Sequence, residues 1–273
     1  MNLVQGAVLG VVQGLTEFLP ISSTAHLRIV PALAGWPDPG AAFTAVVQLG
    51  TMLAILLYFW REILHISVAW ARGFTDPEAR ASLECRIGWY VLLATIPIGV
   101  FGLLFADQIE TGARNLWLIA STLVVLGLVL GVADRVGARN RVEEQIRLRD
   151  GLVVGLAQAA ALIPGVSRSG ATITAGLFMG LEREAAARFS FLLSVPAVVL
   201  SGLFELRKVG AHGGPGVAVT VLSTVLAFVV GLASIHWLLR YLTRHSTAVF
   251  VGYRVALGVA LLGLLSSGLL SAT

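Results

Sequence analysis

The sequence predicts an all-α integral membrane protein, and its composition carries that prediction. Hydrophobic residues make up 57% of the 273-residue chain and charged residues only 12%, whereas soluble domains carry about 25% charged residues. Long apolar segments recur along the chain, and about 20 apolar residues in a helix span the ~30 Å hydrocarbon core. The arginines gather in short loops between these segments, so the pI near 9.8 indicates membrane orientation rather than nucleic-acid binding.

Six segments are long and apolar enough to be membrane-spanning helices. They are residues 41–60, 86–106, 115–133, 186–205, 216–239 and 248–270. The single cysteine, Cys85, excludes an internal disulfide and a multi-cysteine metal site. The first residues lack the basic stretch and the cleavage site of a signal peptide, so we expect no cleavage there. Residues 1–273 are therefore predicted to form a single membrane domain.

Two other apolar segments are each interrupted by a proline and a group of polar residues. Residues 3–19 run into PISSTAH, and residues 148–163 run into PGVSRSGAT. Such an interruption is typical of a re-entrant or broken helical element, which is tolerated at membrane depth only where it faces protein or a wet cavity. We call residues 3–26 the first broken element and residues 148–174 the second broken element.

The two broken elements resemble each other, which predicts an internal repeat. A one-residue slip aligns Pro20 with Pro164 and Ser23 with Ser167. Before that slip, the residues that match at a constant offset of 145 are Gly6 with Gly151, Gly10 with Gly155 and Gln13 with Gln158. Because these glycines recur every fourth residue, we also expect them to form a smooth face for close helix packing.

The repeats are predicted at about 1–133 and 148–273, joined by a cytoplasmic linker at 134–147. Each repeat holds three spans, an odd number, so the second repeat is expected to be inverted and the broken elements to meet near the membrane midplane. The loops on the linker side, including 61–86, carry eleven arginines, against four basic residues on the other side, and the arginine-rich side is cytoplasmic by the positive-inside rule. The four basic residues of the other side are Arg28, Arg114, Arg207 and Lys208.

The polar residues of the two broken elements suit a phosphate ester or anhydride. Arg168 can grip phosphate oxygens in a bidentate fork. Glu17, with Gln13 one turn earlier on the same helix face, can hold a hard divalent cation such as Mg²⁺ or Ca²⁺. His26 can transfer protons near neutral pH. Ser23, three residues before His26, is a candidate nucleophile activated by a neighbouring base.

The residues around this group are expected to bind the phosphate oxygens. Backbone N–H groups of a turn at Gly165 and Gly170, and the positive end of a helix that resumes near Thr172, would point at an anion. The other hydroxyl residues of the group are Ser22, Thr24, Ser167 and Ser169. Ionisable residues inside a membrane usually serve function, so we expect Arg168 to pair with Glu17 at rest and with a diphosphate in use.

At these residues the sequence resembles a known family. QGLTEFLPISSTAH (13–26) and PGVSRSGAT (164–172) are similar to the two signatures of the bacterial undecaprenyl-pyrophosphate phosphatases, the bacitracin-resistance family, and the likeness covers essentially the whole chain. The resemblance implies hydrolysis of undecaprenyl diphosphate to the monophosphate and inorganic phosphate. That step recycles the lipid carrier of cell-wall synthesis and gives bacitracin resistance. The resemblance also implies a metal-dependent site on the outer side of the bacterial cytoplasmic membrane.

The family's motifs fall on the residues already singled out. The acidic motif falls on Gln13 and Glu17, the serine–histidine motif on Ser22, Ser23 and His26, and the phosphate-binding motif on Ser167, Arg168, Ser169 and Thr172. Because glutamine stands at the first acidic position, only Glu17 supplies an anionic metal ligand.

Two mechanisms and two functions stay open at this point. Either Ser23 attacks the phosphorus while His26 or Glu17 manages the protons, or a metal-bound water attacks while Ser23 only positions it. Broken helices in inverted repeats are also transporter architecture, so the alternative function is a polyprenyl-phosphate transporter or flippase. The expected partners are the lipid diphosphate and membrane lipids, without nucleic acid, and a homodimer is compatible with the sequence.

Overall fold

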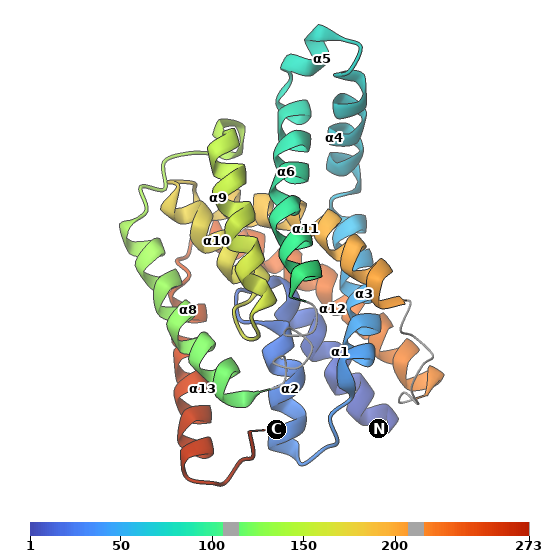
Figure 1. Ribbon diagram of the computed structural model, residues 1–273, viewed down its shortest axis with the longest axis vertical. Helices are drawn as coiled ribbons and strands as arrows, with labels where there is room; N and C mark the ends of the chain where they lie inside the picture. The colour runs from blue at the N-terminus through green and yellow to red at the C-terminus, as the bar shows by residue number, and fades with distance from the viewer. Residues whose placement is uncertain (106–114, 207–215, 273) are drawn as a thin grey trace.

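The computed structural model describes residues 1–105, 115–206 and 216–272, which are mostly helical (Figure 1). The first broken element lies in α1, Leu3–Phe18, and α2, Ser23–Ala34. The second lies in α9, Leu148–Ala159, a 3-10 turn at Ala160–Leu162, and α10, Arg168–Phe178. Each element is thus two helices joined by a short loop, as the sequence predicts.

Helices also form at all six segments predicted to span the membrane. They are α3 (Gly40–Tyr58), α6 (Leu83–Leu104), α8 (Leu116–Val136), α11 (Arg183–Leu206), α12 (Val217–Leu242) and α13 (Ala248–Ser266). Within the described residues, α6, α8, α12 and α13 are long and apolar enough to cross a membrane. These helices confirm the prediction of an all-α, multi-pass membrane protein.

Residues 61–86 are not the loop that the sequence analysis predicted. After Phe59 the chain bends by 73° and continues as α4, Trp60–Arg72, followed by the short α5, Pro77–Ala81. No proline or glycine interrupts residues 60–72, so the chain stays helical beyond the apolar segment. α4, α5 and the start of α6 rise as a hairpin above the rest of the molecule (Figure 1). Of the basic residues assigned to the opposite side, Arg114, Arg207 and Lys208 lie outside the described residues.

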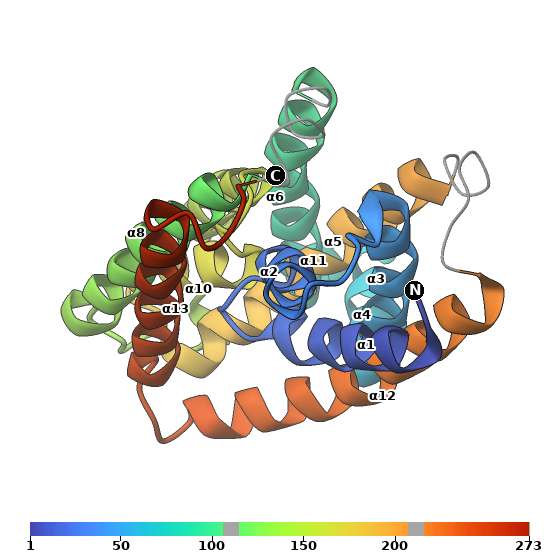
Figure 2. The ribbon, with the colours of Figure 1, turned by 90° about the horizontal axis from the view of Figure 1, so that it is seen from below.

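The broken elements pack on helices of the other half of the chain. α1 lies along α12, as Figure 2 shows, while α9 lies along α6. Glycines make both approaches close. A Cβ added at Gly10 would lie 2.4 Å from the Ser223 carbonyl oxygen, and one added at Gly155 would lie 2.5 Å from the Ala94 Cα. The predicted glycine faces are therefore confirmed as helix-packing surfaces.

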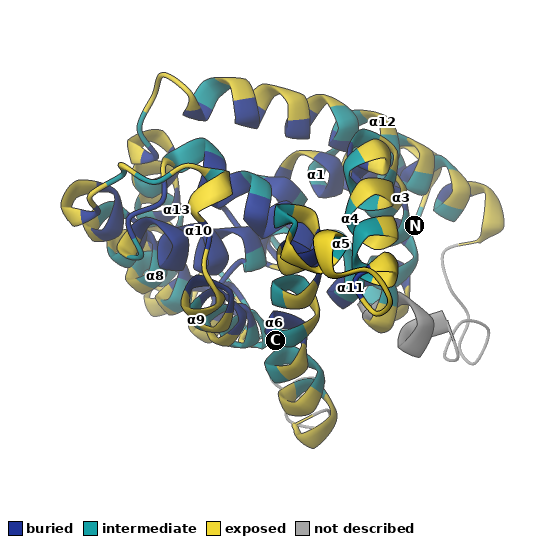
Figure 3. Cartoon of the chain, turned by 90° about the horizontal axis from the view of Figure 1, so that it is seen from above, coloured by how far each residue is buried: buried dark blue, intermediate teal, exposed yellow. Residues whose placement is uncertain are grey.

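The interior is formed where the two broken elements meet α11. Phe18 at the end of α1 packs edge-on against Phe191 of α11, with ring centroids 5.5 Å apart. α10 is buried along most of its length, whereas α12 is buried on one side and exposed on the other (Figure 3). The exposed apolar faces of α6, α8, α12 and α13 suit contact with lipid. Most polar residues of the broken elements are thus buried near the centre of the molecule, while Thr24 is exposed.

Candidate active site

The side chain of Glu17 joins the two broken elements. Its Oε2 accepts hydrogen bonds from Ser23 Oγ at 2.6 Å and from Gln13 Nε2 at 3.0 Å. Its Oε1 is bonded to the guanidinium group of Arg168 in an ion pair. The Glu17 side chain is only 7% exposed, so this carboxylate is enclosed by its partners. The predicted pairing of Glu17 with Arg168 is confirmed.

The same backbone arrangement presents Ser23 and Arg168, which are the first residues of α2 and α10. The preceding residues, Ser22 and Ser167, have left-handed φ values of 75° and 71°. Each hydroxyl then accepts a hydrogen bond from the N–H three residues later, Ser22 at 3.4 Å and Ser167 at 3.1 Å, which is the N-cap arrangement.

These caps match at the offset of 145, so the one-residue slip in the predicted alignment is wrong here. Ser22 corresponds to Ser167, and Ser23 corresponds to Arg168. The second helix of the second broken element begins at Arg168, four residues before the expected start near Thr172. Arg168 therefore stands at the helix N-terminus itself, where a bound anion would also meet the backbone N–H groups.

Arg254 of α13 is a central residue that the sequence analysis missed. It is fully buried, and its guanidinium group donates to the Pro20 carbonyl at 3.1 Å in one loop. It also donates to the carbonyls of Gly165 at 3.0 Å and Val166 at 3.1 Å in the other loop. Further hydrogen bonds reach the carbonyls of Thr122 and Leu123 in α8. A lone arginine within an apolar span was the available signal, because such residues are costly in a membrane.

The electrostatics of this centre favour an anion. Among the described residues, Arg254 forms no ion pair with a carboxylate, so the two arginines outnumber the one glutamate. The N-termini of α2 and α10 add the positive ends of two helix dipoles. Gly170 has no side chain, and a Cβ there would lie 2.8 Å from Arg254 Nη1. Gly165 has a φ of 85°, which favours glycine in the tight turn.

His26 does not contact Ser23 as the sequence analysis expected. Its Nδ1 lies 2.7 Å from the Ser22 carbonyl oxygen, and its Nε2 lies 2.6 Å from the Tyr253 hydroxyl. A carbonyl only accepts, so Nδ1 carries a proton, and when the ring is neutral Nε2 accepts from the Tyr253 hydroxyl. The Ser23 hydroxyl is hydrogen-bonded to Glu17 instead. The ring of His26 stacks on the ring of Tyr253.

Three hydroxyl residues expected to bind phosphate have structural contacts. Thr172 is fully buried, and its Oγ1 donates to the Arg168 carbonyl and lies 2.6 Å from Ser190 Oγ, which joins α10 to α11. Ser169 Oγ donates to the Leu19 carbonyl at 3.0 Å and so ties the two loops together. Thr24 is exposed, with its Oγ1 3.2 Å from Ser22 Oγ.

The donor set at Gln13 and Glu17 fits a hard divalent cation. Gln13 is 1% exposed, and its Oε1 has no hydrogen-bond partner among the described residues. Carboxylate and amide oxygens are the ligands that Mg²⁺ and Ca²⁺ prefer. In the structure the Gln13 amide turns Nε2 toward Glu17, so the amide must turn over for Oε1 to join Glu17 as a ligand. Over residues 1–105, 115–206 and 216–272, no group of three or more His, Cys, Asp or Glu could hold a metal. A cation here would thus take further ligands from substrate phosphates and water.

Fold and site together define an all-α membrane protein with two broken helical elements, in which one carboxylate, Glu17, contacts both the Ser23 hydroxyl and the Arg168 guanidinium group. The family model described as bacitracin resistance protein BacA matches residues 6–260, and the chain belongs to this family. An undecaprenyl-diphosphatase 3 of Frankia alni is 55% identical over 290 residues, covering 100% of this chain and 98% of that protein. The undecaprenyl-diphosphatase of a Nocardioides species is 53% identical over 273 residues, with 100% of both chains covered.

Proposed function

We propose that this protein hydrolyses undecaprenyl diphosphate to undecaprenyl phosphate and inorganic phosphate. The names of its relatives supply the substrate. The observation that carries the reaction is the contact of Glu17 with both the Ser23 hydroxyl and Arg168. One carboxylate thereby connects a candidate nucleophile to a phosphate-binding cation, which fits phosphoryl transfer better than transport.

Ser23 is proposed to attack the terminal phosphorus of the substrate. Glu17 Oε2, 2.6 Å from Ser23 Oγ, takes the hydroxyl proton as general base. The bond between the terminal phosphorus and the bridging oxygen breaks, and undecaprenyl phosphate leaves. Water then attacks the phosphoserine and releases inorganic phosphate. In the variant mechanism a water molecule attacks directly, and Ser23 only positions it.

Arg168 is proposed to bind the terminal phosphate. In the structure it shares Glu17 with Ser23, so proton uptake by Glu17 weakens the ion pair and leaves the guanidinium group to the phosphate. The N–H groups at the start of α2 and α10 would stabilise the charge that builds on the phosphate oxygens. Arg254 keeps both loops in place through their carbonyls.

A divalent cation, Mg²⁺ or Ca²⁺, is proposed at Glu17 and the Gln13 Oε1. When bound, it would neutralise phosphate charge and orient the diphosphate. The expected location is the bacterial cytoplasmic membrane, with the site open to its outer side and the linker 134–147 in the cytoplasm. The lipid tail would lie against the apolar helices beside the site. The resulting lipid monophosphate would return to cell-wall synthesis, and this recycling would underlie bacitracin resistance.

Phosphate release from a polyprenyl diphosphate in detergent micelles tests the activity, because micelles exclude transport as a readout. We expect metal-dependent release by the native chain and loss of it in Glu17→Gln and Ser23→Ala. Arg149→Gln, an exposed arginine outside the site, is the matched control and should release phosphate at the native rate. Full release by Glu17→Gln would contradict the proposed base.

Trapping separates the two mechanisms. Rapid acid quenching of the native enzyme with substrate labelled in the terminal phosphate should leave label on Ser23, which peptide mass spectrometry identifies. If instead Ser23→Ala keeps a substantial rate and the native enzyme never carries label, direct attack by water is the mechanism.

A further inference from the structure

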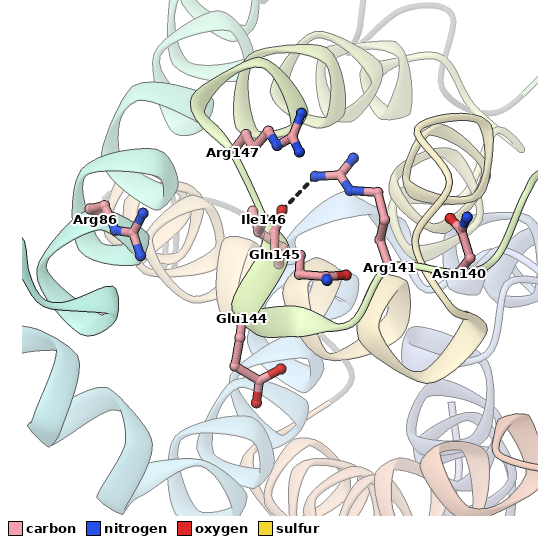
Figure 4. A pocket seen from close by; sticks show the side chains of 7 residues that line it. All are labelled: Arg86, Asn140, Arg141, Glu144, Gln145, Ile146 and Arg147. Atoms are coloured by element: carbon pink, nitrogen blue, oxygen red, sulfur yellow. Dashed lines mark hydrogen bonds between the residues drawn. The ribbon is translucent and has the colours of Figure 1, made fainter.

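A polar, largely open cavity lies away from the candidate active site, where the linker meets α6 and α9. Its volume is about 430 Å³, and its lining includes Arg86, Arg141, Glu144 and Arg147 (Figure 4). None of these residues belongs to the broken elements or contacts Glu17, Ser23 or Arg168 through a hydrogen bond or ion pair. The proposed function therefore leaves three arginines at this cavity unexplained.

Two of the three guanidinium groups have no side-chain partner in the part of the chain that the structure describes. Arg86 and Arg147 are exposed, and among the described residues neither side chain forms an ion pair or a hydrogen bond. Glu144 is the one acidic residue of the lining, and in Figure 4 it points away from Arg141 and Arg147. The cavity thus collects positive charge that the protein does not neutralise from within the lining.

The third arginine gives the cavity a fixed wall. Arg141 is held by Asp150, with Nη1 to Oδ1 at 3.1 Å and Nη2 to Oδ2 at 2.5 Å, and by the Met179 carbonyl at 2.9 Å. Hydrogen bonding to Asp150 raises the pKa of Arg141, so its charge is permanent. Its Nε is buried and has no hydrogen-bond partner in the described part of the chain. Because this nitrogen is buried, it is not open to a ligand, and Arg141 contributes to the cavity as a fixed positive charge.

The cavity lies where the apolar helices end. α6 begins at Leu83, α8 ends at Val136 and α9 begins at Leu148. If α6 and α8 span the membrane, as their length and hydropathy indicate, the linker between α8 and α9 lies next to lipid headgroups. Basic pockets between helices at this height bind anionic headgroups. Arginine forks also match the oxygens of a phosphate.

We propose that this cavity is a second anion site, which binds the phosphate group of an anionic phospholipid headgroup through Arg86 and Arg147, with Arg141 as its fixed wall. The same chemistry would accept inorganic phosphate, so the test compares the two sources. The site is separate from the catalytic centre, and its occupancy does not depend on the proposed reaction.

The experiment is a binding titration of the purified full-length protein in detergent by native mass spectrometry. The ligands are phosphatidylglycerol, phosphatidylcholine with the same chains, and inorganic phosphate. The variants are Arg86→Gln, Arg147→Gln and, as the matched control two residues further along, Arg149→Gln, an exposed arginine outside the lining. All three should keep native phosphate release, which reports that they fold.

We expect phosphatidylglycerol to bind more tightly than phosphatidylcholine, and each cavity variant to weaken it by about tenfold, the scale of one charge-assisted hydrogen bond. Arg149→Gln should stay within about twofold, well below one such bond. Competition by inorganic phosphate with the same variant pattern would support the site and assign a soluble ligand. Equal losses in all three variants, or equal binding of the two lipids, would overturn the proposal.

Discussion

α1 ends at Phe18 and α2 begins at Ser23, while α10 begins at Arg168, 145 positions after Ser23. Both helix starts follow a serine with a left-handed φ that caps the next turn. The side chains that the two elements add are different. Glu17 corresponds to Leu162 at this offset, and His26 corresponds to Ala171. The same backbone conformation thus presents two helix N-termini, while the carboxylate of Glu17 and the hydroxyl of Ser23 come from one element and the guanidinium group of Arg168 from the other.

The largest effect on activity should come from Arg168, the charged residue that the second broken element supplies. Arg168→Ala is expected to lower kcat by about 100- to 1,000-fold, the scale for removing one donor that stabilises transition-state charge. The kcat of Arg168→Lys should fall between those of the native chain and Arg168→Ala, because lysine keeps the charge and loses the bidentate fork. Steady-state phosphate release measures both. A near-native rate in Arg168→Ala would remove the second broken element from the chemistry.

Arg254 should stabilise both broken elements, because it donates hydrogen bonds to a loop of each. Arg254→Met keeps the length of the side chain and removes every donor, so the carbonyls of Pro20, Gly165 and Val166 lose a partner. We expect a loss of about 2–4 kcal/mol in stability, since buried acceptors without partners cost ~1–3 kcal/mol each and partly find water. Thermal unfolding in detergent measures the loss. If Arg254→Met melts at the native temperature, the loops at Pro20 and Gly165 do not need the hydrogen bonds of Arg254 for their stability.

The glycine faces allow the two elements to be compared as packed helices. Gly10→Ala places a Cβ against Ser223 of α12, and Gly155→Ala places one against Ala94 of α6. Each is expected to cost about 1–3 kcal/mol, as overpacking usually does. Gly263→Ala is the control, because a Cβ there meets nothing within 4 Å. If only one of the two lowers the melting temperature, the elements are not packed equivalently.

The smallest effects should come from the caps. Ser22→Ala and Ser167→Ala lose the cap and strain a left-handed φ, and each should cost about 1–2 kcal/mol. Ser22→Gly and Ser167→Gly accept the left-handed φ, so each should cost only a few tenths of a kcal/mol in stability. Melting temperatures of the four variants give two alanine–glycine differences. If the alanine–glycine difference in melting temperature at Ser22 is unlike that at Ser167, the two left-handed caps do not contribute equally to stability.

The pairing of Glu17 with Arg168 and the glycine faces could be predicted from the sequence, because a buried charge needs a partner and closely packed helices need small residues. The helical continuation after Phe59 could not, since hydropathy marks the end of an apolar segment and not the end of a helix. The predicted Ser23–His26 contact rested on spacing alone, and the structure turns His26 toward Tyr253. Arg254 was hidden because its partners are backbone carbonyls, which carry no sequence pattern.

The position of Arg254 has a consequence for how the protein is made. α13 is the last described helix, yet its arginine binds loops that are synthesised far earlier, at Pro20 and at Gly165. Until α13 enters the membrane, these carbonyl oxygens lack the Arg254 donor and can accept only from water or from other N–H and O–H groups. The contacts that fix both loops can therefore be completed only once α13 has entered the membrane, so a chain in which α13 is not yet inserted would hold Glu17, Ser23 and Arg168 without their final arrangement.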